Sequence, residues 1–235
     1  TANLLRTPQL GLTLTKPAAK TSGTGKSKRT REALLLAGEE LMGWKGIEAT
    51  SVRDINQKAK QKNTSAIGYY FKNKEGLLQA ILDRRMVPLD DERRARWDEI
   101  KSANGVKNLT LQDLVDVQVL PLAEAVLSEP AWRNYVLLLA QLVSAHGAPY
   151  QHLWRDRYDK TSGNIIAAMR DHMAATDDNV WRQRVSDMIT FSIGSLCERT
   201  YVLGRSEKAP RLSDERYLSN LVQTATAILS VPSQL

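Results

Sequence analysis

The chain has 235 residues, of which 42% are hydrophobic and 25% are charged, so it is long enough to bury a core and ordinary in charge. Its single cysteine, Cys197, excludes an internal disulfide and fits a cytoplasmic protein. No apolar run reaches the roughly 18 residues of a membrane span or resembles a signal peptide, so we expect no membrane partner.

The positive charge is concentrated toward the N-terminus. The net charge is +7, yet residues 1–86 carry 16 Lys and Arg against 7 Asp and Glu, whereas residues 87–235 carry 17 against 19. A lysine-rich tail does not explain the difference, because residues 29–86 keep an excess of +4. Phosphate binding needs such a localised positive field, so we expect nucleic acid to bind at this end.

The first residues lack periodicity. Residues 1–27 are rich in Thr, Gly, Ser, Lys and Pro, which indicates a disordered basic arm. Such an arm would either contact DNA, along the minor groove, or have no role. The first helix is expected over 28–43, where apolar residues recur on one face, with Gly43 and Gly46 bracketing its end.

Residues 50–74 contain two short helical patterns joined by a tight turn. Ser51 and Asp54 match a capping box at the start of the first pattern, and Asn63 or Thr64 caps the second. The second pattern ends in two tyrosines and a phenylalanine flanked by lysines. This arrangement is typical of a helix-turn-helix that reads DNA.

A fourth helix is expected to begin after Asn73, and Pro88 would interrupt it or begin the next one, because proline lacks the N–H that a helix interior needs. We place a domain boundary there, between a DNA-binding domain (28–86) and a second domain (87–235). Further helices are expected at 89–103, 110–128, 130–146, 150–174, 178–204 and 213–230. The fold class is therefore all-α, with a three-helix N-terminal head and a larger helical domain.

The second helix of the motif can lie in the major groove of double-stranded DNA, which is wide enough for one helix. Its hydroxyl, small and aromatic side chains would face the bases, and the ends of neighbouring helices would reach phosphates. The expected DNA contacts are Thr50, Ser51, Arg53, Asn63, Thr64, Ser65, Ala66, Gly68, Tyr69, Tyr70 and Lys74. Tyr69 and Tyr70 alone could be ordinary partly buried aromatics, and the lysines alone could be a solvated face, so the joint pattern carries this prediction.

A pocket for a small ligand would be lined by apolar and aromatic groups with a few polar ones. The candidates are Trp132, Tyr135, Trp154, Tyr158 and Tyr201, against the alternative that such aromatics belong to the core. The three histidines have no paired spacing, so no metal site is expected. Since no nucleophile elbow or phosphate-binding glycine loop occurs, we expect neither an enzyme nor a cofactor.

The segment from about Arg29 to Leu82 resembles the TetR/AcrR-type family of bacterial one-component regulators, through residues 46–55 (GIEATSVRDI) and 67–78 (IGYYFKNKEGLL). The resemblance implies three N-terminal helices that bind operator DNA. It also implies a larger helical domain that dimerises and binds a small effector, which changes the spacing of the two heads and releases the operator. Two positions depart from the family pattern: Gln61 replaces a usual turn glycine, and Gly68 replaces a larger side chain that faces DNA.

The resemblance favours a ligand-responsive, homodimeric repressor. The alternative is a partner-controlled DNA-binding protein whose C-terminal domain is only a dimerisation scaffold. A hydrophobic cavity in that domain would favour the first function and a filled core the second. In the family the last long helices pair across a two-fold axis, and the residues expected to do so here, unless they belong to the core, include Ile165, Met169, Met188, Ser192, Gly194, Ser195 and Leu196.

Overall fold

The computed structural model describes residues 25–63, 65–154, 157–158, 160–173, 176–204 and 210–231. Within these ranges every regular element is helical, which confirms the all-α prediction. The elements are α1 (Gly25–Lys45), α2 (Val52–Lys58), α3 (Ala66–Phe71), α4 (Lys74–Asn104), η1 (Val106–Asn108), α5 (Leu111–Ser128), α6 (Pro130–Val143), η2 (Ala145–Leu153), α7 (Lys160–Asp171), α8 (Asp178–Gly204) and α9 (Asp214–Ser230).

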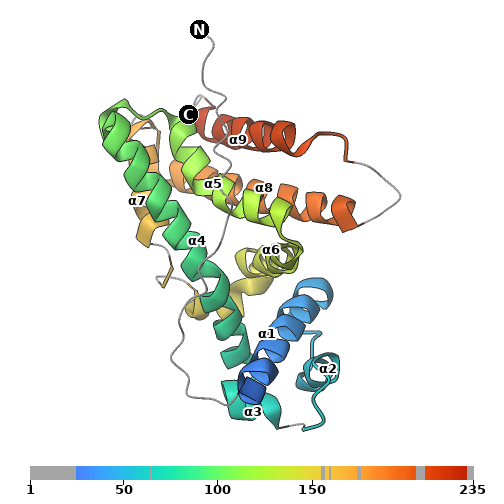
Figure 1. The fold of residues 1–235 in the computed structure, drawn as a ribbon. Helices are drawn as coiled ribbons and strands as arrows, with labels where there is room; N and C mark the ends of the chain where they lie inside the picture. Colours follow the sequence, from blue (N-terminus) through green and yellow to red (C-terminus); the bar gives the residue numbers. More distant parts are fainter. Residues whose placement is uncertain are drawn as a thin grey trace.

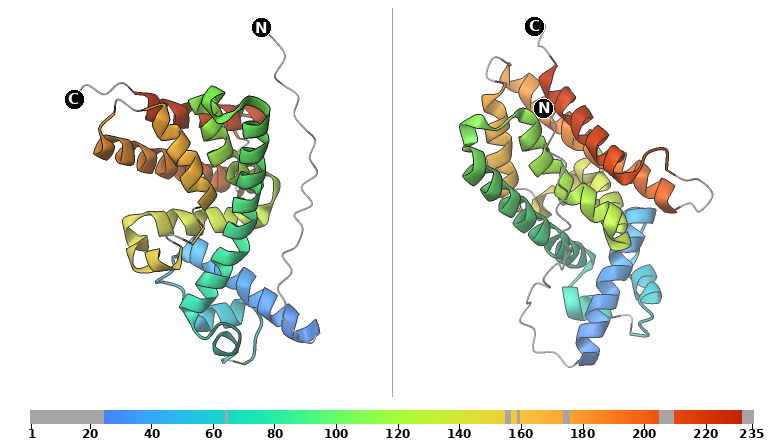
Figure 2. Two further views of the ribbon diagram at one scale, coloured as in Figure 1. Left: turned by 90° about the vertical axis from the view of Figure 1, so that its left-hand side faces the viewer. Right: turned by 45° about the horizontal axis from the view of Figure 1, so that its top comes forward.

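The helices form two groups joined by α4. Figure 1 shows α1, α2 and α3 together at the lower end, and α4 running from them into the group formed by α5 to α9. Both views of Figure 2 show the same arrangement. We call residues 25–86 the head and residues 87–231 the body.

One continuous hydrophobic core fills both groups. In the head it is formed by apolar side chains from all four helices, among them Leu34, Ile55, Ile67, Phe71 and Leu77. In the body, α5 lies against α4, α6, α7 and α9, and α8 packs on α6 and α9. The largest contact between head and body is that of α1 with α6.

In the head, α2 and α4 begin after residues whose side chains cap them. Ser51 Oγ accepts a hydrogen bond from the Asp54 amide, and the Asp54 carboxylate accepts one from the Ser51 amide, so the predicted capping box is confirmed. The hydrogen bonds from the Ser51 amide and from its hydroxyl hold the pKa of the Asp54 carboxyl below its usual range. Asn73 caps α4 as predicted, because its Oδ1 accepts the Gly76 amide at 2.7 Å.

The first helix is longer than predicted. It starts at Gly25 rather than residue 28 and ends at Lys45, so the last residues assigned to the basic arm belong to α1. The remainder of the arm, residues 1–24, lies outside the described residues. Gly43 lies inside α1, whereas Gly46 follows it with φ +105°, which is the conformation expected of glycine after a helix.

The turn after α2 places Lys60, not Gln61, in the left-handed region. The Gln61 amide donates to the Asn56 carbonyl at 2.8 Å, and the Lys60 amide donates to the Gln57 carbonyl at 3.0 Å. These two bonds form a Schellman motif, whose left-handed residue is usually glycine. Lys60 occupies it with φ 54°, so the left-handed residue of this turn lies one position before Gln61.

Replacing Lys60 with glycine should therefore stabilise the protein. The Cβ of a non-glycine residue in this conformation costs about 1 kcal/mol. We expect Lys60→Gly to raise the free energy of unfolding in urea by about that amount. Lys60→Ala is the matched control, because it removes the same charge but keeps the Cβ. An equal gain in both variants would show that charge, not backbone strain, is responsible.

Pro88 neither interrupts α4 nor begins a new helix, and the helix is continuous from Lys74 to Asn104. Proline removes one amide donor but fixes φ near the helical value. Arg85 and Leu89 on either side of it are buried, and we attribute the continuity of the helix to this packing. The boundary placed after residue 86 therefore falls within a single helix.

The helix predicted over 150–174 is wrong in its first third. Residues Ala145–Leu153 form a 3-10 helix, and α7 begins only at Lys160. Pro149 removes an amide donor within this segment. At Gly147 a Cβ would lie 2.1 Å from the carbonyl oxygen of Leu142, so the chain can turn back on α6 only because a glycine stands there.

Candidate DNA interface and its link to the body

α3 lies at the end of the head, as Figure 1 shows. Ala66, Ile67 and Phe71 are buried against the head core. Gly68 and Tyr69 are exposed, and Tyr69 is the more prominent, with 80% of its surface accessible. The Tyr69 ring meets the neighbouring Tyr70 ring edge to face, with 4.8 Å between the centroids.

Two of the expected DNA contacts are buried. Thr50 is 0% exposed, and its hydroxyl donates to the Gly46 carbonyl at 2.8 Å, so it closes the loop after α1. Ala66 was expected to face outward but is 5% exposed, because it lies on the same side of α3 as Ile67. We therefore exclude Thr50 and Ala66 from the interface.

Two further candidates have internal partners. The Lys74 ammonium donates to the carbonyls of Ile47 and Thr50 at 2.9 and 3.2 Å, so it ties the start of α4 to the loop before α2. The Tyr70 hydroxyl donates to Ser27 Oγ at 3.2 Å and ties α3 to the first turn of α1. Both side chains are only partly buried and position the interface whether or not they reach a phosphate.

The remaining candidates are exposed around α3. Ser51 and Arg53 lie at the start of α2. Asn63 and Ser65 precede α3, and Asn63 Oδ1 accepts the Ser65 amide at 2.9 Å. Thr64 lies outside the described residues. Ser51, Arg53, Asn63 and Ser65 are thus exposed on the head.

The sequence pattern missed cations at the start of α1. Lys26, Lys28 and Arg29 are exposed there, one helix turn or less from Ser27 and hence from Tyr70. Residues 26 and 27 were assigned to the basic arm because Thr, Gly, Ser, Lys and Pro dominate residues 1–27. The capping residue that would signal a helix start is missing.

A buried ion pair of the head, between α1 and α4, also contacts α6 of the body. Arg85 Nε and Nη2 donate to the Glu39 carboxylate at 2.7 and 3.1 Å, and Nη2 also donates to the Ala131 carbonyl at 3.1 Å. Both side chains are buried, and burial raises the pKa of Glu39 although Arg85 opposes this shift. The guanidinium also stacks on Trp132, 4.8 Å from the ring centroid.

The end of α1 is fastened to α6 by backbone contacts. Gln141 Nε2 donates to the carbonyls of Met42 and Gly43 at 2.8 and 3.1 Å, while its Oε1 accepts the Ile47 amide at 3.0 Å. A Cβ on Gly43 would lie 2.5 Å from the Asn134 carbonyl oxygen, so this glycine permits the close approach of the two helices. The free carbonyls at the end of α1 are thus satisfied from the body.

η2 makes a second link to the head. The Tyr150 hydroxyl donates to the Glu48 carboxylate, and His152 Nε2 lies 2.7 Å from the Glu75 carboxylate. Burial and the bond to Glu48 raise the pKa of Tyr150 to about 12. Beside these contacts an open cleft of about 420 Å³ separates η2 from the first turn of α4.

The five candidate ligand residues do not converge on one cavity. Trp132 lines a small cavity in the body, and Tyr135 is fully buried behind it, edge to face at 5.7 Å. Tyr158 accepts from Gln79 and donates to Asp83, while Trp154 packs on the core. Tyr201 is exposed and meets Trp44 on the surface, so its assignment to a pocket is corrected.

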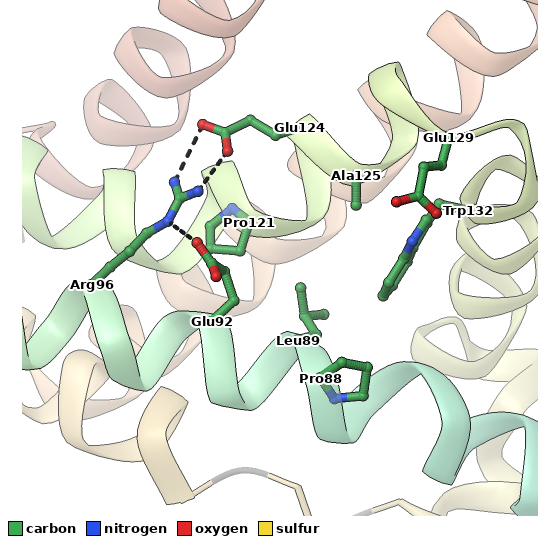
Figure 3. A pocket seen from close by; sticks show the side chains of 9 residues that line it. All are labelled: Pro88, Leu89, Glu92, Arg96, Pro121, Glu124, Ala125, Glu129 and Trp132. Atoms are coloured by element: carbon green, nitrogen blue, oxygen red, sulfur yellow. Dashed lines mark hydrogen bonds and ion pairs between the residues drawn. The ribbon is translucent and has the colours of Figure 1, made fainter. Parts of the chain in front are cut away.

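The cavity beside Trp132 has a volume of about 20 Å³. Figure 3 shows the apolar side chains of Leu89, Pro121 and Ala125 between the ribbons of α4 and α5, with carboxylates at the edges. A drug-sized ligand needs hundreds of cubic ångströms, so this cavity is small. The expected residues of a dimer interface, Ile165, Met169, Met188, Ser192 and Leu196, are buried inside the body instead.

Nothing else in the described ranges suggests other chemistry. They hold no group of three or more His, Cys, Asp or Glu side chains placed for a metal ion. No helix in them is long and apolar enough to cross a membrane. Cys197 is partly buried, and burial raises its thiol pKa to about 11, which disfavours the reactive thiolate.

One solved structure supports the fold, and two others are similar to part of it. A HlyIIR mutant protein has a TM-score of 0.52 and 14% identity, with 88% of this chain and 99% of that chain covered. A TetR-family transcriptional regulator from Rhodococcus sp. has 19% identity, coverage of 86% and 100%, and a TM-score of 0.47. One from Mesorhizobium loti has 12% identity, coverage of 88% and 98%, and a TM-score of 0.49.

Two family models match the chain in sequence. Residues 34–81 match the model described as bacterial regulatory proteins, tetR family, and residues 117–227 match the tetracyclin repressor-like C-terminal domain. No curated protein matches it significantly. The first match covers the helix-turn-helix and the second covers most of the body, so both halves point to one family. The chain belongs to the TetR family of bacterial regulatory proteins.

Proposed function

We propose that the protein is a homodimeric repressor that binds operator DNA through α3 and releases it when a small molecule binds the body. The observation that carries this proposal is the exposed face of α3, set in the positively charged end of the chain. An exposed helix with hydroxyl and aromatic groups suits the major groove, and surrounding lysines suit phosphates. Regulators of this family are not enzymes, and we assign no catalytic role.

Within this proposal Ser65, Gly68 and Tyr69 face base edges, and Ser51 and Arg53 face the backbone. Asn63 orients the start of α3 through its bond to the Ser65 amide. Tyr70 and Lys74 hold the helix in place through Ser27 and the α1–α2 loop, with their exposed parts near phosphates. Lys72, exposed at the end of α3, joins this set.

The test begins with selection of a binding sequence from a random duplex pool, followed by fluorescence anisotropy over a range of salt concentrations. We expect affinity to fall steeply with salt, by about 0.9 in the log–log slope for each phosphate contacted. Tyr69→Ala should weaken binding roughly 30-fold, because a dimer would lose two contacts of about 1 kcal/mol each. Tyr201→Ala, also an exposed tyrosine, is the control. An affinity that does not change with salt would contradict binding through phosphate contacts. An unchanged operator affinity in Tyr69→Ala would contradict the proposed contact of Tyr69 with DNA.

The dimer is proposed to form through the outward faces of α8 and α9. Gly194 lies midway along α8, exposed, and a Cβ there would have no neighbour within 4 Å. Gly194→Arg should therefore fit the single protomer but separate two copies. Light scattering should give twice the chain mass of 26.3 kDa for the parent protein and about the single mass for the variant. Gly163→Arg, equally open but on α7, should remain dimeric; a monomeric parent protein would contradict the proposal.

A second function, control by a partner protein, is favoured by two observations. The body cavity is small, and the exposed Trp44 and Tyr201 rings meet at 5.3 Å where head and body adjoin. Exposed aromatic pairs are suited to protein interfaces. Release of operator DNA by a small molecule with purified protein alone would favour the ligand-responsive repressor over this alternative.

A further inference from the structure

The body cavity has an excess of negative charge at its rim. Arg96 donates to Glu92 at 2.8 Å and to the two Glu124 oxygens at 3.2 and 2.5 Å, so its guanidinium is shared between two carboxylates. Figure 3 places the Glu129 carboxylate on the other side of the cavity, above Trp132. Three carboxylates and one guanidinium line the cavity and give a formal charge of −2.

Glu129 is the carboxylate of this rim that has no neutralising group. Among the described residues its side chain has no hydrogen-bond or ion-pair partner. Its backbone terminates α5 and precedes α6, so the side chain projects from a fixed corner of the body. A cation in the cavity would lie beside this unneutralised charge.

Trp132 supplies a second, independent feature. Only 2% of the residue is exposed, and its indole N–H has no acceptor among the described residues. Arg85 covers one ring face and Tyr135 meets the ring edge to face, while the residue still lines the cavity. A buried donor without an acceptor costs free energy, which an acceptor on a ligand would recover.

We infer that this cavity binds the ammonium group of a small amine that carries a hydroxyl close to its nitrogen and an apolar remainder. The inference rests on the proposed ligand response and names the chemical class of the ligand. A primary ammonium group is about the size of a water molecule, so a cavity of about 20 Å³ holds it. Its N–H groups donate to Glu129, and the hydroxyl oxygen accepts the Trp132 N–H.

The apolar remainder of the ligand lies in the mouth of the cavity, against Pro88 and Pro121. The same lining disfavours other ligand classes. An anion would meet a net negative rim, and a hydrocarbon would leave both the Glu129 charge and the Trp132 N–H without a partner. The proposed ligand satisfies both groups.

The experiment uses three probes of one shape, titrated by calorimetry into the full chain without DNA. The first is phenylethanolamine. The second is its neutral isostere, in which a methyl group replaces the ammonium group, and the third is phenethylamine, which lacks the hydroxyl. We expect phenylethanolamine to bind at least about tenfold more tightly than either of the others.

Two conservative variants test whether Glu129 and Trp132 recognise the amine and the hydroxyl. Glu129→Gln keeps the side-chain shape without the charge, so the preference for phenylethanolamine over its neutral isostere should fall to about one. Trp132→Phe keeps an aromatic ring without the N–H, so the preference over phenethylamine should disappear. Glu215→Gln, on the exposed first turn of α9, is the matched control and should behave as the parent protein.

Equal binding of phenylethanolamine and its neutral isostere, or no saturable heat from any probe up to about 10 mM, would overturn the inference. Operator affinity is measured separately with the same probes. Intact DNA binding without amine binding would remove the cavity inference and leave the DNA-binding proposal standing. If the amine binds but operator affinity does not change, the ligand class is supported, but the proposal that the ligand releases operator DNA is contradicted.

Discussion

Replacing Arg85 with methionine is expected to lower the free energy of unfolding by about 3–5 kcal/mol, the usual cost of removing one partner from a buried ion pair. The variant leaves the Glu39 carboxylate buried without its cation and the Ala131 carbonyl without its donor. It also removes the cation stacked on Trp132. Urea denaturation at a fixed protein concentration measures the effect.

The loss should depend on pH. Burial already raises the pKa of Glu39 above 4.5, and removing Arg85 raises it further. Between the unfolded pKa and this raised value, the folded state holds a proton that the unfolded state has released. Stability of Arg85→Met should therefore fall as pH rises from about 4.5 toward neutrality, more steeply than in the parent protein.

The double variant Glu39→Met/Arg85→Met is the control for this prediction. It removes both charges, so no buried ion remains unpaired, and its stability should return close to that of the parent protein. A double variant as unstable as Arg85→Met would show that packing, rather than the unpaired carboxylate, causes the loss. A loss below about 1 kcal/mol in the single variant would contradict burial of the pair.

Gly76→Ala is expected to destabilise the head by about 3 kcal/mol. A Cβ at this position would lie 2.0 Å from the Phe71 carbonyl oxygen, a contact that only a backbone shift relieves. Phe71 is buried in the head core, and the Gly76 amide is bonded to the Asn73 cap at 2.7 Å, so neither side moves freely. Because this corner sets the direction of α3, operator affinity should fall as well.

Gly68→Ala is the matched substitution in the same region. A Cβ on Gly68 meets nothing within 4 Å, and alanine favours a helix over glycine by about 1 kcal/mol. We expect this variant to be slightly more stable than the parent protein. Thermal unfolding of the two variants compares them directly; equal losses in both would mean that the Phe71 carbonyl does not restrict residue 76.

The sequence was informative where the determinants are local. Ser51 with Asp54, and Asn73, cap their helices because the bonds span three residues. Apolar spacing was sufficient to place α5, α8 and α9 closely. The continuity of α4 through Pro88 depends on burial from both sides, which no local pattern contains.

The interface and the cavity were predicted less well for the same reason. Thr50 is polar and lies next to a helix start, yet the return of the loop to Gly46 buries it. Lys60 takes the left-handed position because the hydrogen bonds at the end of α2 run one residue earlier than a turn glycine at Gln61 would require. Arg85 contacts both Glu39 and Trp132, which lie on helices distant in sequence, so only the tertiary structure reveals these contacts.

The unbroken α4 has a consequence for protein engineering. Its first half completes the core around α1 to α3, its second half packs on α5, and α1 itself ends on Gln141 of α6. A fragment that ends at residue 86 would lack the second half of α4 and would expose Arg85 and the α6-facing side of α1 to water. The DNA-reading end is therefore not a portable module, and a chimera with another regulator needs to carry α6 together with α1 to α4.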